Sequence, residues 1–259
     1  MIILMHSSKT MRQPSSGPAP TGAPPLLDKA EELVEYLRTL SPAQLAKAMK
    51  VSAELAGKVR DLHAEWSTKP DRQAPAAATF VGDIYSGLQV DTFKAADRAY
   101  ADKHLRILSG LYGILRPFDG ISPYRLEMGY KLPAGPYANL YRFWGTEVAE
   151  QLPSAGRIVN LAAGEYSKTV LPHVDKERVV TPRFLTVDER SGEPRFVVVH
   201  AKIARGTFAR WLVTGRVKDG AVREFAEIGY RYREKLSTPD EPAFVCEEFG
   251  GKGLSVRLT

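Results

Sequence analysis

The chain begins with a short apolar run that gives way at once to polar residues: Met1-Ile2-Ile3-Leu4-Met5-His6-Ser7-Ser8-Lys9-Thr10. Five apolar residues are too few for a signal sequence or a membrane span, so the run predicts a buried strand. In α/β sheets, functional loops commonly follow the carboxyl ends of strands. We therefore expect the side chains of Ser8, Lys9 and Thr10 to lie in a binding site.

Helical and strand patterns both occur further along the chain. Apolar residues at helical spacing predict helices over 26–40, 97–108, 137–151 and 204–213. Ser41-Pro42 and Ser52 each mark the start of a further helix. Apolar or β-branched runs between Gly and Pro predict strands over 157–163, 178–187, 195–200 and 242–248, with a hairpin turn at Gly192-Glu193.

These patterns predict an α/β (α+β) fold. We expect one compact domain over residues 1–259, with a mixed sheet and flanking helices. Residues 11–25 are rich in Pro, which favours a surface loop over a regular element.

The charge distribution favours a polyanionic partner. Lys and Arg number 36 against 30 Asp and Glu, a net charge of +6. Between residues 200 and 235, nine cations face four acids, so most of the excess is local. The alternative is an ordinary solvated basic surface. The one cysteine, Cys246, lies in an apolar run and excludes an intramolecular disulfide, which is typical of the cytoplasm.

Residues 105–117 form an apolar stretch with two glycines, Gly110 and Gly113, three residues apart. This pattern is typical of a helix-hairpin-helix element, in which glycine lets the backbone approach a DNA phosphate. An alternative is a buried helical hairpin whose glycines only permit close packing. If the element binds DNA, its contact residues are Arg106, Ser109, Gly110, Tyr112, Gly113 and Arg116.

Two further motifs carry charge. Arg125 and Glu127 lie two apart in a loop-like sequence, and Lys202 and Arg205 share one helical face. Each pair is suited either to a binding site or to a structural ion pair. The five histidines are scattered and no dinucleotide fingerprint occurs, so we expect neither a metal nor a cofactor.

Several long motifs, in order, resemble the YaaA peroxide-stress family. They run from Gly82 to Leu88, from His104 to Pro117 and from Pro123 to Gly129, and shorter matches follow at Phe143-Trp144-Gly145, Glu165-Tyr166 and Ala204-Arg205-Gly206. The resemblance implies a basic cleft, a helix-hairpin-helix-like element, DNA binding and indirect limitation of free iron under peroxide stress. The binding residues that it implies are Lys9, Thr10, Asp83, Tyr85, Arg106, Arg116, Arg125, Glu127, Lys202, Arg205 and Gly206.

The chain departs from the family pattern at His6-Ser7-Ser8, Ala163-Gly164 and Ile203. Three functions therefore stay open. The first is binding of double-stranded or branched DNA. The second is an enzyme in which Lys9 is the nucleophile and Glu127 transfers a proton. The third is binding of a small anion, such as a phosphorylated metabolite. The sequence predicts no membrane partner and leaves the oligomeric state undefined.

Overall fold

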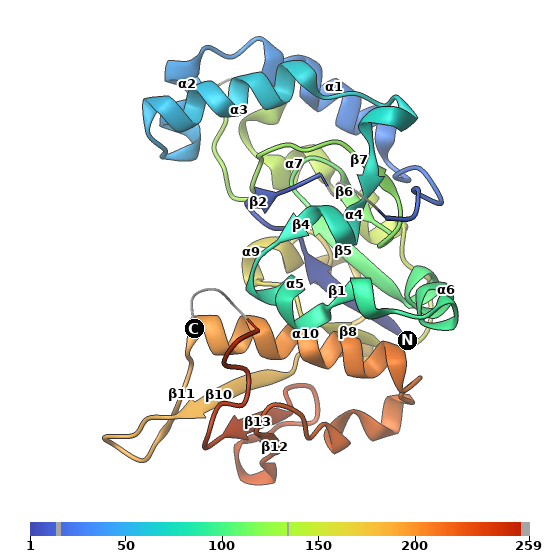
Figure 1. Ribbon diagram of the computed structural model, residues 1–259, viewed down its shortest axis with the longest axis vertical. Helices are drawn as coiled ribbons and strands as arrows, with labels where there is room; N and C mark the ends of the chain where they lie inside the picture. Colours follow the sequence, from blue (N-terminus) through green and yellow to red (C-terminus); the bar gives the residue numbers. More distant parts are fainter. Residues whose placement is uncertain (14–16, 134, 255–259) are drawn as a thin grey trace.

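A computed structural model of the protein describes residues 1–13, 17–133 and 135–254. Its centre is a five-stranded sheet in the order β6-β5-β1-β8-β9, with β1 in the middle (Figure 1). The bounds are Ile2–His6 for β1, Leu105–Ser109 for β5, Gly113–Leu115 for β6, Ile158–Asn160 for β8 and Val179–Val180 for β9. Strands β5 and β8 run parallel to β1, whereas β6 is antiparallel to β5. The predicted α/β fold with a mixed sheet is confirmed.

Strand β1 is the point at which the sheet changes its direction of growth. The chain passes from β1 to β5 on one side and later returns to β8 on the other. In open α/β sheets ligands bind in the crevice that such a reversal leaves at the carboxyl ends of the strands. The relevant ends are His6 in β1 and Asn160 in β8.

Three helices form a layer at one end of the molecule (Figure 1). They are α1 (Leu27–Arg38), α2 (Pro42–Met49) and α3 (Ala53–Glu65). Ser41 and Gln44 form a capping box at the start of α2, and the side chain of Ser52 caps α3. Lys50 adopts a left-handed conformation with φ of 52°, which ends α2 and turns the chain back into α3. Helices α2 and α3 therefore form a helical hairpin.

The other helices are α4 (Ala76–Thr79), α5 (Asp83–Leu88), α6 (Ala95–His104), α7 (Leu140–Trp144), α8 (Glu147–Glu150), α9 (Gly164–Ser167) and α10 (Val198–Thr214). Short 3₁₀ turns cover Pro70–Arg72, Val90–Thr92, Pro136–Ala138, Leu171–His173, Lys176–Arg178, Asp219–Glu224 and Glu234–Leu236. Among the residues that the structure describes, no helix is both long and apolar enough to cross a membrane.

A second sheet has four strands in the order β11-β10-β13-β12. Their bounds are Arg183–Val187 for β10, Pro194–Arg195 for β11, Tyr230–Tyr232 for β12 and Ala243–Cys246 for β13. Helix α10 runs between the two sheets (Figure 1). Phe184, Phe208 and Phe244 pack together there, and Cys246 is buried as expected. Two small ribbons pair β2 (Thr10–Met11) with β4 (Phe80–Val81) and β3 (Ala74–Pro75) with β7 (Gly120–Ile121).

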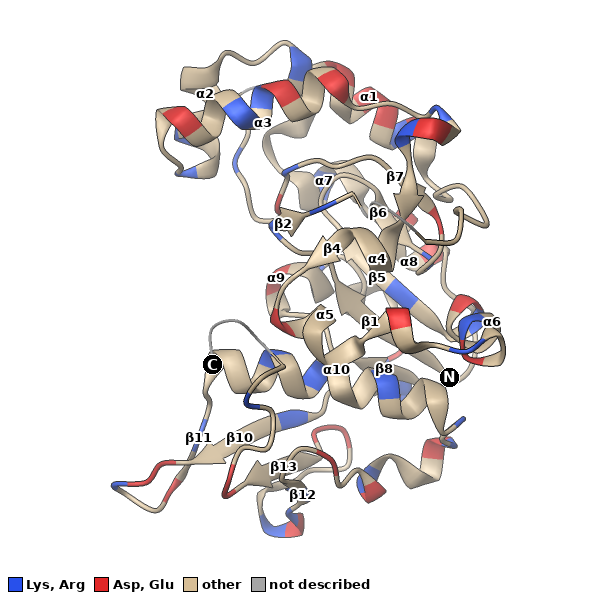
Figure 2. Ribbon diagram, in the orientation of Figure 1, with Lys and Arg blue, Asp and Glu red and all other residues tan. Residues whose placement is uncertain are grey.

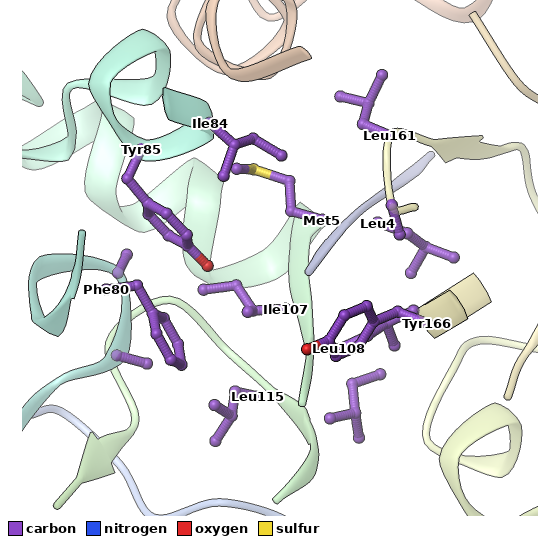
Figure 3. Packing of buried hydrophobic residues seen from close by; sticks show 14 of the residues in the cluster. Leu4, Met5, Phe80, Ile84, Tyr85, Ile107, Leu108, Leu115, Leu161 and Tyr166 are labelled. Atoms are coloured by element: carbon purple, nitrogen blue, oxygen red, sulfur yellow. The ribbon is translucent and has the colours of Figure 1, made fainter. Parts of the chain in front are cut away.

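The crossing of α5 and α10 depends on two glycines. A Cβ at Gly206 would lie 1.8 Å from the carbonyl oxygen of Ile84, and one at Gly87 would lie 2.2 Å from that of Ile203. Both neighbours are backbone atoms, so neither can move aside cheaply. This close approach places α10 beside α5, next to the core around Met5 and Tyr85 (Figure 3).

The helix-hairpin-helix prediction for residues 105–117 is wrong. The segment is a β-hairpin of β5 and β6, in which Gly113 turns with φ of 68°. Leu105 to Leu108 pair with β1, and this tertiary pairing overrides the helical spacing of the apolar residues. The residues from Leu108 to Leu115 are buried, so the turn is not open to a DNA backbone.

Other predicted boundaries shift for related reasons. Helix α6 ends at His104, four residues before the predicted end, because the chain there joins the sheet. The strand predicted over 195–200 is wrong beyond Arg195, since Val198 already belongs to α10. The helix predicted over 137–151 is broken, and the positive φ of Gly145 lies between α7 and α8. The Pro-rich stretch has no regular element from residue 12 to 13 or from 17 to 25, and residues 14–16 lie outside the described part.

Candidate functional site

A cleft of about 810 Å³ lies between α2 and the loops that follow β1 and β7. Four lysines line it: Lys9, Lys47, Lys50 and Lys131. Two carboxylates, Glu127 and Glu165, lie among them. The remaining lining residues are Gln44, Ala48, Gly129, Tyr130 and Pro133. The excess of cations gives the cleft an electrostatic preference for anions.

The floor of the cleft joins the loop after β1 to the Arg125–Glu127 motif. The ammonium nitrogen of Lys9 lies 3.6 Å from Oε2 of Glu127, and the exposed fractions of the two side chains are 57% and 9%. The guanidinium of Arg125 donates a hydrogen bond of 3.2 Å to the carbonyl of Lys9. The structure therefore brings these three predicted site residues together.

Glu127 has an unusual environment for a carboxylate. Burial raises its pKa, while the nearby hydroxyl of Tyr166 and the charge of Lys9 oppose this rise. The hydroxyl of Tyr166 is buried and reaches no acceptor at hydrogen-bond distance within the described residues. Burial raises the pKa of Tyr166 well above its usual value, and the charge of Glu127 adds to that effect. A raised carboxyl pKa suits proton transfer near neutral pH.

His6 ends β1 on the side of α10. Its ring stacks on Tyr166 with centroids 5.1 Å apart, and its Nδ1 accepts a hydrogen bond of 3.2 Å from the backbone N–H of Ala163. Burial, together with the charges of Arg205 and Lys202 on α10, lowers the pKa of His6 to about 3. His6 is therefore neutral at physiological pH. The sequence-based site did not include it.

The other predicted residues near β1 have mostly structural contacts. The hydroxyl of Tyr85 donates to the carbonyl of His6 at 2.9 Å, and Figure 3 shows Tyr85 and Tyr166 on opposite sides of the strands. Ser8 donates to the carbonyl of Val81, and Thr10 lies in β2 and is exposed. Asp83 is buried at the first position of α5.

Arg106 and Arg116 lie apart from the cleft, beside α6. Arg106 donates to the carbonyl of Asp102 at 2.8 Å. Arg116 pairs with Asp119 at 3.1 Å and with Asp102 at 3.7 Å. Because acids already compensate Arg116, this cluster is a structural network rather than an extension of the cleft.

The residues predicted for the hairpin are interior packing residues. Ser109 lies 2.6 Å from the hydroxyl of Tyr124, and the hydroxyl of Tyr112 accepts from the indole of Trp66 at 2.8 Å. The carbonyl of Gly110 accepts from the indole of Trp144 at 3.1 Å. Gly206, which was also predicted to be a binding residue, instead allows α10 to approach α5 closely.

Sequence reasoning missed three of the four cleft lysines. Lys47 and Lys50 stand at the end of a helix whose exposed positions looked like an ordinary solvated face, and Lys131 lies in an irregular loop. A pair of lysines three apart at a helix end was the available signal. In the described residues no group of three or more His, Cys, Asp or Glu has an arrangement that could hold a metal ion.

The comparisons with known proteins identify the family. A family model described as peroxide stress protein YaaA matches residues 1–236. A UPF0246 protein from Salinispora tropica is 62% identical over 258 residues, which cover 99% of this chain and 98% of that protein. A UPF0246 protein from Shewanella loihica is 39% identical, and one from Marinomonas sp. is 38% identical. Both alignments cover 96% of this chain; they cover 99% of the Shewanella protein and 98% of the Marinomonas protein. The chain therefore belongs to the peroxide stress protein YaaA family, whose members also carry the name UPF0246.

Proposed function

We propose that the protein binds double-stranded or branched DNA through the lysine-lined cleft, as part of a peroxide-stress response. The observation that carries this proposal is the convergence of Lys9, Lys47, Lys50 and Lys131 from three separate chain segments on one cleft. Of these four lysines, only Lys9 has a carboxylate within 4.0 Å among the described residues. Cations without acidic partners are available to neutralise phosphates.

The α2–α3 hairpin supports the same proposal. Its turn exposes Lys50 beside the cleft, and Lys47 lies one helical turn earlier. A helical hairpin with a left-handed turn residue can present backbone and lysine together to a phosphate. The DNA-contacting hairpin is then α2–α3 rather than the segment 105–117. Shielding of DNA would limit peroxide damage, and any effect on free iron would be indirect. A cytoplasmic location fits this role.

The experiment measures binding to a fluorescent duplex and to a four-way junction over a range of NaCl concentrations. Four phosphate contacts predict a slope of about −3.6 in a plot of log affinity against log salt. The double substitution Lys47→Gln, Lys50→Gln should reduce the slope by roughly 2. Lys103→Gln, Lys176→Gln removes the same charge at exposed positions away from the cleft and should change the slope little. Undetectable or salt-independent binding would contradict the proposal.

A second candidate is an enzyme that uses Lys9 and Glu127 on damaged DNA. Their separation of 3.6 Å and the raised pKa of Glu127 favour it. Lys9 would add to the aldehyde carbon as a free amine, and Glu127 would accept a proton from the adding nitrogen. Glu127 would then return the proton to the hydroxyl group of the adduct, which leaves as water when the imine forms. Borohydride trapping on DNA with an abasic site would capture the adduct. A Lys9→Ala variant that keeps all activity would remove this candidate, whereas Lys9→Ala need not abolish DNA binding.

A further inference from the structure

A second cavity, of about 530 Å³, lies among α4, α5 and α6. It shares no lining residue with the lysine-lined cleft. Its volume is that of a small-molecule site, since such sites enclose roughly 300 to 1,000 Å³. The apolar part of its wall includes Pro75, Ala77, Ala78, Phe80, Val90 and Phe118. The charged residues that line it are Arg12, Asp91 and Arg98. We call it the Arg98 cavity.

Two local features of the backbone bring charged residues to this cavity. Gln89 adopts a left-handed conformation with φ of 49°, which ends α5 and starts the turn Val90–Thr92. Because this turn lies against α4, Asp91 lines the cavity. The backbone N–H of Arg12 donates a hydrogen bond of 2.9 Å to the carbonyl of Thr79, which extends the pairing of β2 with β4. Arg12 is thereby held beside the same wall.

The guanidinium of Arg98 is supported by an aromatic ring. It lies over the ring of the buried Phe118, with its central carbon 4.0 Å from the ring centroid. This cation–π contact occupies one face of the guanidinium. Because Arg98 lines the cavity and is only half-buried, the remaining face is available to a ligand. Flat rings such as nucleobases stack on guanidinium planes.

The charges at the wall of the cavity lack ion-pair partners. Helix α6 carries acidic as well as basic residues (Figure 2), but its acids contact other arginines. Asp97 lies 2.7 Å from Arg216, and Asp102 lies 3.7 Å from Arg116. Within the described part of the chain, none of the three charged lining residues takes part in an ion pair within 4.0 Å. Two arginines against one carboxylate leave an excess of positive charge for a ligand to neutralise.

We propose that the Arg98 cavity binds a nucleoside monophosphate. The base would stack on the guanidinium of Arg98 and lie against the apolar wall. The phosphate would accept hydrogen bonds from the guanidinium of Arg12, and the ribose hydroxyls would donate to the carboxylate of Asp91. An aromatic amino acid also combines a flat ring with charged groups, but it is neutral overall, so the excess of positive charge favours the nucleotide. The proposal does not depend on DNA binding in the cleft, because the two sites have no lining residue in common.

Calorimetric titration of the protein with AMP and with GMP tests the proposal. At constant ionic strength it should show saturable binding of one nucleotide per chain. Adenosine lacks the phosphate and ribose 5-phosphate lacks the base, so each should bind at least about tenfold more weakly than AMP. Arg12→Gln should weaken the binding of AMP but leave that of adenosine unchanged.

The base platform has a matched control on the same helix. Arg98→Gln should weaken the binding of AMP by at least about tenfold, since it removes the stacking surface and a charge. Lys103→Gln also removes one cation from α6, but Lys103 is exposed and does not line the cavity. Its affinity for AMP should equal that of the unsubstituted protein. Circular dichroism shows whether each variant is folded.

A second readout on the unsubstituted protein locates the nucleotide even if Arg98→Gln fails to fold. The methyl groups of Ala77 and Ala78 line the Arg98 cavity, whereas that of Ala48 lines the lysine-lined cleft. In protein with ¹³C-labelled alanine methyl groups, AMP should shift the resonances of Ala77 and Ala78 and leave that of Ala48 in place. The double variant Lys47→Gln, Lys50→Gln should keep the affinity for AMP, which separates failure of this site from failure of the cleft.

Four outcomes would overturn the proposal. They are no saturable binding of either nucleotide, equal affinities of the Arg98→Gln and Lys103→Gln variants for AMP, resonance shifts confined to Ala48, and binding of phenylalanine or tryptophan at Ala77 and Ala78 in place of the nucleotides.

Discussion

Mild acid should destabilise the folded protein through two buried histidines. Burial lowers the pKa of His6 to about 3 and that of His63 to about 4, from an ordinary value of 6.5. In both cases the unfolded chain binds the proton more tightly than the folded protein does. Above pH 6.5 the two rings therefore do not reduce the free energy of unfolding. This free energy decreases as the pH falls from 6.5 toward the pKa values of the two histidines in the folded protein.

The magnitude follows from the same values. At pH 5 the unfolded imidazole is almost fully protonated, so keeping one ring neutral costs about 2 kcal/mol and keeping two neutral costs about 4 kcal/mol. Asp119 acts in the opposite direction, because burial raises its pKa to about 6. The carboxyl group binds its proton more tightly in the folded state, which offsets roughly 1 kcal/mol of the loss in unfolding free energy at pH 5. The raised pKa of Glu127 has the same sign as that of Asp119.

Urea unfolding at pH 7 and pH 5, followed by circular dichroism, measures the loss. His6→Gln and His63→Gln should each reduce the difference between the two free energies of unfolding by about 2 kcal/mol. His173→Gln, at an exposed position, is the control and should behave as the unsubstituted protein does. If the His6 and His63 variants lose as much stability in acid as the unsubstituted protein, the two rings do not carry the effect and the reasoning fails.

Three further predictions concern the scaffold. Gly206→Ala should lower the free energy of unfolding by roughly 3 kcal/mol or more, because its Cβ would collide with the backbone of Ile84. Denaturant titration measures this free energy, and an unchanged value would contradict the close α5–α10 crossing. Ser41→Ala should cost about 1 kcal/mol by removing the capping box of α2, whereas Thr39→Ala, outside the box, is the control. The thiol of Cys246 is buried and its pKa is raised to about 11. A thiol reagent should therefore react with it only at the rate at which the protein unfolds. Rapid reaction of the native protein would contradict this and show that β13 is accessible.

The sequence predicted those features that local patterns determine. The apolar run at the N-terminus is β1, and Ser41 and Ser52 cap the helices that they were expected to start. Each of these signals acts within a few residues, so the rest of the fold is not needed to interpret it. The structure also brings together Lys9, Arg125 and Glu127, which the sequence analysis named through the resemblance to a family rather than through a local pattern.

The failures arise where distant segments determine the outcome. Residues 105–109 have a helical spacing of apolar residues but pair with β1, which is about a hundred residues away. The spacing of Gly110 and Gly113 suggested a phosphate contact, yet their neighbours are Leu126 and Trp144, which no local pattern reveals. The cleft shows the same limit, because Lys47 and Lys50 become site residues only when α2 packs opposite the loop that holds Glu127.

Tyr166 connects His6 at the end of β1 with Glu127 in the lysine-lined cleft, and this constrains how the cleft can be tested. The ring of Tyr166 stacks on His6, while its hydroxyl lies near the carboxylate of Glu127, which in turn pairs with Lys9. A substitution of Tyr166 would therefore disturb the support of His6 and the environment of Glu127 together. Substitution of Lys47 or Lys50, which line the cleft from the end of α2, tests the cleft without removing the ring of Tyr166. Loss of function in a Tyr166 variant would show that this end of the sheet matters, but it would not assign the loss to the lysine-lined cleft.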